Sequence, residues 1–246
     1  MQPIVSAKSL NRTKNWRVLI YGKPGVGKTT AARHLTGRTL VLDLDDSSKV
    51  LSGADNINVQ PFDRTKPMVE MNDFVTHLND IIKGYDNLVV DNISAFEKDW
   101  FVEQGRKSTN GIGNELQDYS KWTNYFARVM TTIFMDADLN VLVTAWENTR
   151  DITAASGQAF SQYAPAIRDS VRDSLLGLTD VVGRLIVNAK TGGRGVILEG
   201  TDAIFAKNRL DNRKAASIET LFDFGKAKSE TTKKEPDVKP AKKLEE

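Results

Sequence analysis

The chain has 246 residues, of which 40% are hydrophobic and 27% charged, with a formal net charge of +2 and no cysteine. This composition is ordinary for one globular domain with its own core, and the lack of cysteine excludes disulfides, thiolate metal sites and a cysteine nucleophile. So small a net charge leaves only a local basic patch for binding nucleic acid. The two histidines, His34 and His77, are far apart in the sequence, so neither is expected to bind a metal. The sequence has no apolar run of membrane-spanning length and no apolar leader, which predicts a cytoplasmic protein that makes no membrane contact.

Strands and helices are predicted to alternate through the first 150 residues. Short apolar runs predict buried strands, and stretches with apolar residues at the helical period predict helices. The strands are predicted at 16–22, 39–46, 86–92 and 139–147, and the helices at 28–37, 71–85 and 116–138. This order is typical of an α/β domain in which helices flank a mostly parallel central sheet.

After residue 150 the pattern changes to antiparallel pairing. Residues 183–200 contain two β-rich runs around the sequence KTGGRG, which predicts a C-terminal β-hairpin. The chain is expected to divide into a polar N-terminal arm at 1–15, an ATPase domain at 16–222 and a lysine-rich tail at 223–246. The tail has almost no large apolar residues, so it cannot bury a core and is predicted to be disordered.

The most specific motif in the chain is a phosphate-binding loop. Gly22–Thr29, GKPGVGKT, satisfies the pattern G-x-x-x-x-G-K-[ST] in full, with a predicted strand before it and a predicted helix after it. Its glycines let successive backbone N–H groups face a phosphate, and the helix that follows adds the positive end of its dipole. Lys28 is expected to reach the β- and γ-phosphates of ATP, and Thr29 to give its hydroxyl to Mg²⁺. The predicted nucleotide-binding residues are Gly22, Lys23, Pro24, Gly25, Val26, Gly27, Lys28, Thr29 and Thr30.

A second metal-side residue is expected where an apolar strand ends. Residues 88–91, LVVD, supply Asp91. A strand-end aspartate can instead cap the next helix. Its position after a complete phosphate loop favours a role in holding Mg²⁺. Thr29 and Asp91 are therefore the predicted protein ligands of Mg²⁺.

Missing motifs argue against several classes of phosphate-loop protein. The chain has no N-K-x-D motif for guanine, no LSGGQ-like transporter signature in the expected place, and no evident arginine-bearing lid of the kind that small-molecule kinases carry. In AAA+ proteins a catalytic carboxylate directly follows the strand aspartate, whereas Asp91 is followed by Asn92.

The catalytic carboxylate is instead predicted at the end of another strand. In RecA-type ATPases it ends the strand after the phosphate-loop helix, which here carries Asp43, Asp45 and Asp46. Asp45 is predicted to activate the attacking water. Asp46 and then Glu97 are the alternatives.

Five motifs together resemble a known family. GKPGVGKTT, LVLDLDD, LVVDNISAF, VLVTAWE and AKNRL, in that order, are similar to motifs of phage RecA-like ATPases of the Sak single-strand-annealing type, relatives of RecA, RadA and KaiC. The resemblance covers residues 16–222 and implies a RecA-like fold. It also implies that Thr144 senses the γ-phosphate, with Glu147 as the alternative, and that Lys207 and Arg209 reach the ATP of a neighbouring protomer. The strand end that carries Asp45 matches the D-x-E of RecA, with Asp in place of Glu.

The function implied by the resemblance is recombination in the cytoplasm of a phage host. ATP-bound protomers would associate with the ATP site at their interface, assemble on single-stranded DNA beside a single-strand-binding protein, and pair complementary strands. Two polar segments, 106–114 and 148–162, are the predicted DNA-binding loops. The candidate side chains for phosphates are Arg150, Arg168 and Arg172, and those for stacking on bases are Phe160 and Tyr163.

Two other functions remain open. One is an annealing module that binds single-stranded DNA and uses ATP to switch assembly with little hydrolysis. The other is a small-molecule nucleotide kinase.

Overall fold

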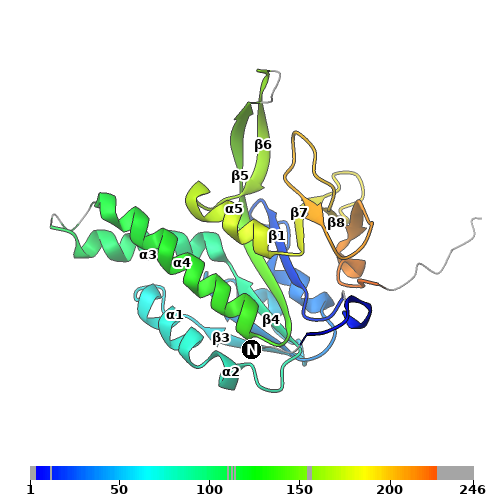
Figure 1. Cartoon of the computed structure of the whole chain (residues 1–246), viewed down its shortest axis with the longest axis horizontal. Coiled ribbons are helices and arrows are strands. Elements are labelled where there is room, and N and C mark those ends of the chain that lie inside the picture. Colours follow the sequence, from blue (N-terminus) through cyan, green and yellow to red (C-terminus); the bar gives the residue numbers. More distant parts are fainter. Residues whose placement is uncertain are drawn as a thin grey trace, which may run out of the picture.

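The computed structural model of the chain describes residues 4–11, 13–109, 111, 113, 115–153 and 157–225. Figure 1 shows a central sheet with the longer helices packed on one face and a two-stranded hairpin that projects beyond the sheet. The predicted tail lies outside the described residues from residue 226 onward. Among the described helices, none has the length and apolar character that crossing a membrane requires.

Six strands of the sheet run parallel, in the order β7-β1-β5-β4-β2-β3. They are β1 (Arg17–Gly22), β2 (Thr39–Asp43), β3 (Ile57–Pro61), β4 (Asn87–Asp91), β5 (Asn140–Thr153) and β7 (Val181–Val187). The remaining strands pair antiparallel: β6 (Ala159–Pro165) with β5, β8 (Arg194–Ile197) and β9 (Lys207–Asn208) with β7, and β10 (Ala215–Ser217) with β8. The mixed α/β fold with a mostly parallel sheet and a C-terminal antiparallel hairpin is therefore confirmed.

Two helices, Ile93–Lys107 and Asp169–Leu178, were not predicted from the sequence, and the predicted helices differ in extent. The α-helices are α1 (Pro67–Thr76), α2 (Leu78–Ile81), α3 (Ile93–Lys107), α4 (Leu116–Asp136) and α5 (Asp169–Leu178), and the 3-10 helices are η1 (Ala7–Ser9), η2 (Thr29–His34), η3 (Ser48–Leu51) and η4 (Ile218–Thr220). The helix predicted at 71–85 begins earlier, with Pro67 in its first turn, and breaks at His77. The helix after the phosphate loop is 3-10 rather than α.

The sheet is buried on both faces, which explains why its strands are continuous apolar runs. Side chains alternate between faces along a strand. In β1, Leu19 and Tyr21 join the core under α1–α5, whereas Val18 and Ile20 join a second core with η2, η3 and η4 on the opposite face.

An aromatic group lies at the centre of the larger core. The ring of Trp122 on α4 lies 5.2 Å from Trp100, 5.6 Å from Phe96 and 4.9 Å from Phe126, measured between centroids. Its indole Nε1 donates a 2.9 Å hydrogen bond to Glu97 on α3. Trp122 is fully buried, so it joins α3 to α4 by packing and by one hydrogen bond.

The predicted loop at 148–162 is wrong. Strand β5 continues to Thr153 and pairs in antiparallel register with β6, so that Ile152 lies opposite Phe160. The hairpin projects beyond the sheet (Figure 1), and its side chains alternate, with Arg150 and Ile152 half-buried and Asp151 and Thr153 exposed. Residues 154–156 at its turn lie outside the described residues, as do three positions within 106–114.

Replacing Trp122 with Ala should lower the free energy of unfolding by about 3–5 kcal/mol, the usual cost of removing a buried aromatic side chain. Urea unfolding followed by far-UV circular dichroism measures this loss. Trp122→Phe is the matched variant, because it keeps a ring but removes the donor to Glu97, and it should cost less. A loss below about 1 kcal/mol for the alanine variant would contradict the central place of this side chain.

Candidate nucleotide-binding site

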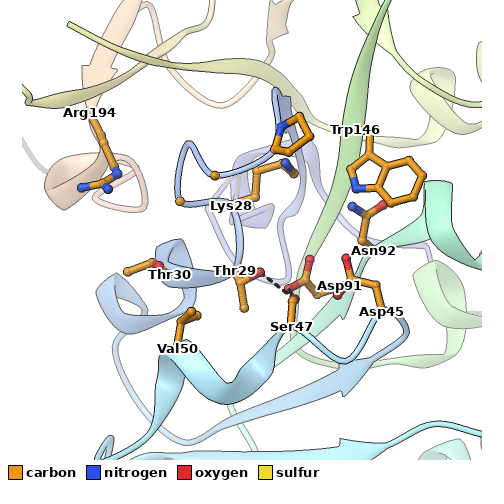
Figure 2. A pocket seen from close by; sticks show the side chains of 13 residues that line it. Lys28, Thr29, Thr30, Asp45, Ser47, Val50, Asp91, Asn92, Trp146 and Arg194 are labelled. Atoms are coloured by element: carbon orange, nitrogen blue, oxygen red, sulfur yellow. Dashed lines mark hydrogen bonds between the residues drawn. The ribbon is translucent and has the colours of Figure 1, made fainter. Parts of the chain in front are cut away.

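The phosphate loop lies at the carboxyl edge of the parallel sheet, where the ends of β1, β2, β4 and β5 converge. A cavity of about 430 Å³ opens over the loop (Figure 2). Ligands of open α/β sheets bind at this edge, beyond the ends of the strands. The cavity is lined by Pro24, Gly25, Gly27, Lys28, Thr29, Thr30, Asp45, Ser47, Val50, Asp91, Asn92, Trp146 and Arg194.

Glycine is required at three positions of the loop. Gly25 and Gly27 have φ of +78° and +100°, in the region that side chains with a β-carbon rarely adopt. A β-carbon at Gly22 would lie 2.6 Å from the carbonyl oxygen of Leu185 on β7. The loop can therefore turn tightly against the sheet only with glycine at these places.

Lys28 is bent back onto its own loop. Its Nζ donates hydrogen bonds of 3.0 and 2.9 Å to the carbonyl oxygens of Gly22 and Lys23, and the residue is 7% exposed. Burial lowers the pKa of Lys28, and the charge of Asp91 opposes this. Neutral carbonyls are weaker partners for an ammonium than a phosphate, so an anion in the cavity would compete for Lys28 effectively.

The two predicted metal-side residues lie close together. Thr29 Oγ1 is 3.0 Å from Ser47 Oγ, which donates a 3.2 Å hydrogen bond to Asp91 Oδ2 (Figure 2). The Thr144 hydroxyl donates to the other oxygen of Asp91. Burial raises the pKa of Asp91, and these hydroxyl donors oppose the rise.

This donor set fits Mg²⁺. Hydroxyl and carboxylate oxygens are the ligands that Mg²⁺ accepts, and it commonly takes one or two carboxylates and completes its shell with substrate phosphates and water. The described residues contain no group of three or more acidic, histidine or cysteine side chains that would hold a metal alone. Thr29 and Asp91 would be the residues that hold Mg²⁺, which supplies positive charge beside the phosphates when it is bound.

Asp45 has an unsatisfied oxygen at the cavity. Its Oδ1 is buried and makes no hydrogen bond within the described structure. Burial raises the pKa of Asp45; Ser47 opposes the rise and Asp91 adds to it. A buried carboxylate oxygen without a hydrogen bond costs free energy and marks a position where a substrate group is expected.

The other candidate acids have different partners. Asp43 accepts hydrogen bonds from the backbone N–H groups of Ser47 and Ser48 and so shapes the turn after β2. Asp46 is exposed, and its Oδ2 lies 3.7 Å from the Nζ of Lys49. Glu97 lines a neighbouring cavity of about 610 Å³ rather than the one over the loop.

Thr144 and Glu147, the two candidate sensors on β5, do not line the cavity over the loop. Thr144 is fully buried, with its hydroxyl on Asp91. Glu147 forms a buried ion pair with Arg184, with 2.6 Å between Oε2 and Nε. Thr144 therefore lies behind the metal-side carboxylate, and Glu147 connects β5 to β7.

Lys207 and Arg209 lie outside the cavity over their own phosphate loop. Lys207 donates to the carbonyl oxygen of Leu176, and Arg209 Nη1 donates to that of Gly177 at 3.2 Å, both in the last turn of α5. Cations near the carboxyl end of a helix are favoured by its dipole. Burial lowers the pKa of Lys207 to about 8, and the charge of Arg209 adds to this.

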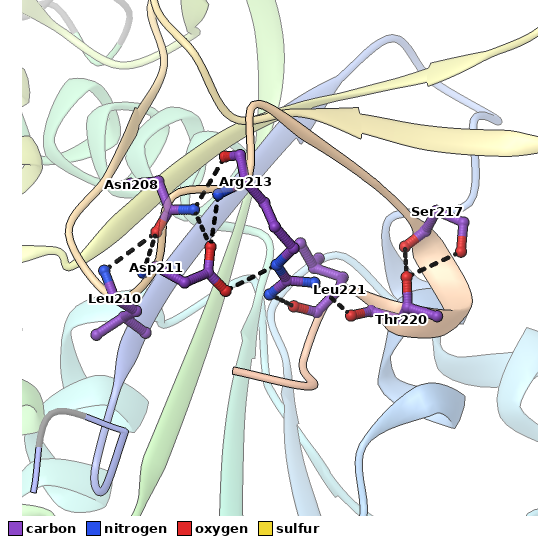
Figure 3. A network of polar contacts seen from close by, with 7 residues as sticks. All are labelled: Asn208, Leu210, Asp211, Arg213, Ser217, Thr220 and Leu221. Carbon is purple, nitrogen blue, oxygen red and sulfur yellow. Dashed lines mark hydrogen bonds and ion pairs between the residues drawn. The ribbon is translucent and has the colours of Figure 1, made fainter. Parts of the chain in front are cut away.

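The residue between these two cations fixes the turn that follows them. Asn208 Oδ1 accepts the backbone N–H groups of Leu210 and Asp211, and its Nδ2 donates 2.7 Å to Asp211 Oδ1 (Figure 3). Asp211 in turn accepts from Arg213 Nε at 2.7 Å. The middle residue of the K-N-R sequence is therefore structural.

The structure separates the candidate DNA-binding side chains. Arg172 is 7% exposed and pairs with Asp169 and Asp173, so its guanidinium is not presented at the surface. Tyr163 lies 3.6 Å beneath the guanidinium of Arg184. The others remain accessible to different degrees: Arg168 is exposed, and Arg150 and Phe160 are half-buried.

Five residues that line the cavity were not among the predicted site residues: Ser47, Val50, Asn92, Trp146 and Arg194. Ser47 connects Thr29 to Asp91, Trp146 follows Thr144 on β5, and Arg194 arrives from β8. Ser47 follows three aspartates that are the expected catalytic type, and a serine in a loop gives no signal of its own. Arg194 carried no local signal, because it is 168 residues from the loop residue that it contacts.

Comparisons with known proteins agree with this geometry. A family model described as AAA domain matches residues 14–210. The structure of the RadB recombinase is 13% identical, with 83% of this chain and 87% of that chain covered and a TM-score of 0.50. A KaiC-like protein from the hyperthermophilic archaeon Pyrococcus horikoshii OT3 is 15% identical, with 77% and 80% covered and a TM-score of 0.47. No curated protein matches the chain. The likeness to RadB shows a RecA-like fold.

Replacing Asp45 with Asn should raise the melting temperature of the nucleotide-free protein at neutral pH. Because burial raises the pKa of Asp45, the folded state binds the carboxyl proton more tightly than the unfolded chain does. The ionised carboxylate therefore costs stability above both pKa values, and the gain should shrink as the pH falls through the ordinary carboxyl range.

Thermal unfolding in EDTA, across a series of pH values, measures this effect. Asp46→Asn is the control, because it removes an exposed carboxylate from the next position. A lower melting temperature for Asp45→Asn than for the wild type would contradict the prediction.

Proposed function

The chain belongs to the AAA domain family, and we propose that it hydrolyses ATP and, assembled on single-stranded DNA, pairs complementary strands. The observation that carries the ATPase is the Asp45 carboxylate, whose buried Oδ1 makes no hydrogen bond, at a cavity that also holds Lys28 and the pair Thr29 and Asp91. The family carries the AAA name, yet the acid at this cavity follows β2 and does not adjoin Asp91. That is the arrangement expected of RecA-type ATPases.

The roles of the side chains follow from their places. Lys28 exchanges two loop carbonyls for the phosphates, and the backbone N–H groups of the glycine-rich turn hold the same charge. Asp45 takes a proton from the attacking water, a task helped by a pKa raised above the ordinary carboxyl value. Thr29 and Asp91 hold Mg²⁺, whose charge offsets that of the phosphates.

The hairpin on β5 supports the DNA-binding part of the proposal. The inner half of β5 carries Trp146 at the cavity, and the outer half projects as the β5–β6 hairpin (Figure 1). At the base of the hairpin, Lys98 and Arg168 line the neighbouring cavity of about 610 Å³. Cations beside a projecting polar hairpin are suited to the phosphate backbone of a single strand. A RadB recombinase has the same fold, which adds fold-level support only.

Self-association is the third part of the proposal. Lys207 and Arg209 lie away from their own phosphate loop, together at the carboxyl end of α5. From there they would serve the ATP of a neighbouring protomer, so that hydrolysis depends on assembly. From the resemblance to the Sak type, we also propose that the protein anneals phage DNA and acts beside a single-strand-binding protein.

One observation favours a variant of this function. Asp45 is one methylene shorter than the glutamate of RecA-type strand ends, which would leave it farther from the attacking water. Slow hydrolysis would then make ATP a switch for assembly of an annealing module, and strand annealing without ATP would support that variant.

ATP turnover with and without single-stranded DNA tests the proposal. The wild type should hydrolyse ATP faster when DNA is present. Lys28→Ala should lose ATP binding, because the phosphates lose their ammonium partner. Asp45→Asn should keep ATP affinity and lose turnover by roughly 10²-fold or more, since an amide cannot accept the proton.

Asp46→Asn is the control for Asp45→Asn and should hydrolyse ATP normally. Wild-type turnover by Asp45→Asn would instead move the catalytic role to Asp46 and then to Glu97. Phosphate transfer to a nucleotide acceptor rather than to water would indicate a kinase.

Arg209→Ala should reduce DNA-stimulated turnover by roughly 10³-fold while ATP binding by an isolated protomer stays nearly unchanged. Mixing Arg209→Ala with Lys28→Ala protein should restore part of the activity, because one supplies the arginine and the other the intact phosphate loop. Lys214→Ala is the matched control, since it removes an exposed cation from the same segment. Mixed oligomers no more active than either variant would show that Arg209 does not act across an interface.

A further inference from the structure

Arg194 joins the C-terminal hairpin to the phosphate loop. It begins β8, and its Nε donates a 2.8 Å hydrogen bond to the carbonyl oxygen of Val26. The side chain lines the cavity over the loop, although it comes from the part of the chain where the sheet has become antiparallel. No motif assigned it to the nucleotide.

The loop leaves space for this guanidinium. A β-carbon at Gly27 would lie 2.7 Å from Arg194 Nε and 3.0 Å from its Cδ. A β-carbon here would displace the arginine side chain, so glycine at this position permits both the backbone turn and the close approach of Arg194. The arginine therefore lies directly against the backbone that is expected to hold phosphate.

In the described part of the chain the guanidinium makes one hydrogen bond, from Nε, and no ion pair. Hydrogen bonds from its own backbone and from Ser217 lower the pKa of Glu219, and the charge of Arg194 adds to this from beyond ion-pair distance. Arg194 is exposed, so Nη1 and Nη2 are available at the cavity. Arginine presents its donors in a planar fork that matches a phosphate, which suits these two nitrogens to a phosphate oxygen.

The place of Arg194 in the cavity indicates which phosphate it would bind. Figure 2 shows Arg194 and Thr30 on one side of the loop, and Asp45 and Asp91 on the other. The side with the two carboxylates is where hydrolysis and Mg²⁺ are expected, so it marks the γ-phosphate. A triphosphate that begins there and follows the loop must end with its α-phosphate near Thr30 and Arg194.

We infer that Arg194 binds the α-phosphate of the nucleotide in its own chain, so that the β7–β8 hairpin closes the nucleoside end of the site. The inference rests on the proposed function, because it requires that the site binds ATP. It differs from the role of Arg209, which acts across an interface and on the γ-phosphate. Since ADP retains the α-phosphate, Arg194 should serve ATP and ADP equally.

Isothermal titration of ATP and of ADP, each with Mg²⁺, into wild-type and variant protein tests the inference. Arg194→Ala should weaken both nucleotides by the same factor, roughly 10- to 100-fold, the range for a lost hydrogen bond to a charged group. Arg194→Lys should weaken them less, because it keeps the charge and loses the fork. Lys190→Ala, which removes an exposed cation from the turn of the same hairpin, should leave both affinities within about twofold.

Two outcomes would overturn the inference. Weaker ATP binding with unchanged ADP binding would place Arg194 at the γ-phosphate. Unchanged affinity for both, with a lower melting temperature, would leave Arg194 only the role of bracing Val26. If Arg194→Ala does not fold, the Arg194→Lys titration decides by the same criteria.

The controls separate this inference from the proposed function. A wild type that binds no ATP would overturn both. A wild type that binds ATP, loses it in Lys28→Ala and keeps it in Arg194→Ala would overturn only the role of Arg194.

Discussion

The buried carboxylate of Asp91 is the interaction on which the site depends. It accepts hydrogen bonds from Thr144 on β5 and from Ser47 after β2, and Ser47 contacts Thr29 in the phosphate loop. Four segments are thus joined at one carboxylate that is almost inaccessible to solvent. Buried polar groups are tolerated only when they are hydrogen-bonded, so these hydroxyls both stabilise the charge of Asp91 and fix the position of Thr29. The parallel sheet makes this possible, because it brings the ends of β2, β4 and β5 to one edge.

Both oxygens of Asp91 are hydrogen-bonded, whereas two other charged groups at the cavity, Lys28 and Asp45, lack ion-pair partners of opposite charge in the described part of the chain. Lys28 is held by neutral carbonyls, and Asp45 has a buried oxygen with no hydrogen bond. Each costs stability in the nucleotide-free protein, because a buried charge is stabilised poorly by neutral groups or by none. A bound nucleotide would supply an anion for the first and a polar group near the second. The loss of folding stability therefore falls on the residues expected to bind and hydrolyse the nucleotide. Active sites commonly trade stability for activity in this way.

Local patterns in the sequence predicted the parts of the molecule that local physics determines. The phosphate loop needs glycine at special backbone angles, and the buried strands need apolar runs, so both leave signals within a few residues. The β5–β6 hairpin is predicted as a loop because its outer part has few apolar side chains, whereas in the structure Ile152 and Phe160 lie opposite each other there. Arg194 was missed because its contact with Val26 depends on tertiary packing between distant segments. Asp45 is predicted by analogy with the strand end of RecA-type ATPases, whereas the missing hydrogen bond at its Oδ1 appears only when its neighbours are placed.

Strand β5 gives the proposed activities a physical connection. Thr144 on this strand contacts the metal-side carboxylate, and Trp146 lines the cavity over the phosphate loop and the neighbouring cavity beside the hairpin. The backbone N–H of Trp146 donates to Ser94 Oγ, and Lys98 lies 4.4 Å from the centre of its ring. A displacement of Trp146 by a nucleotide would therefore act on α3 and on the base of the hairpin together. Coupling between two sites requires an element that both of them bias. A continuous strand with one side chain in both cavities would be such an element if a nucleotide displaces Trp146, and it would relate ATP binding to the proposed DNA binding without a separate hinge.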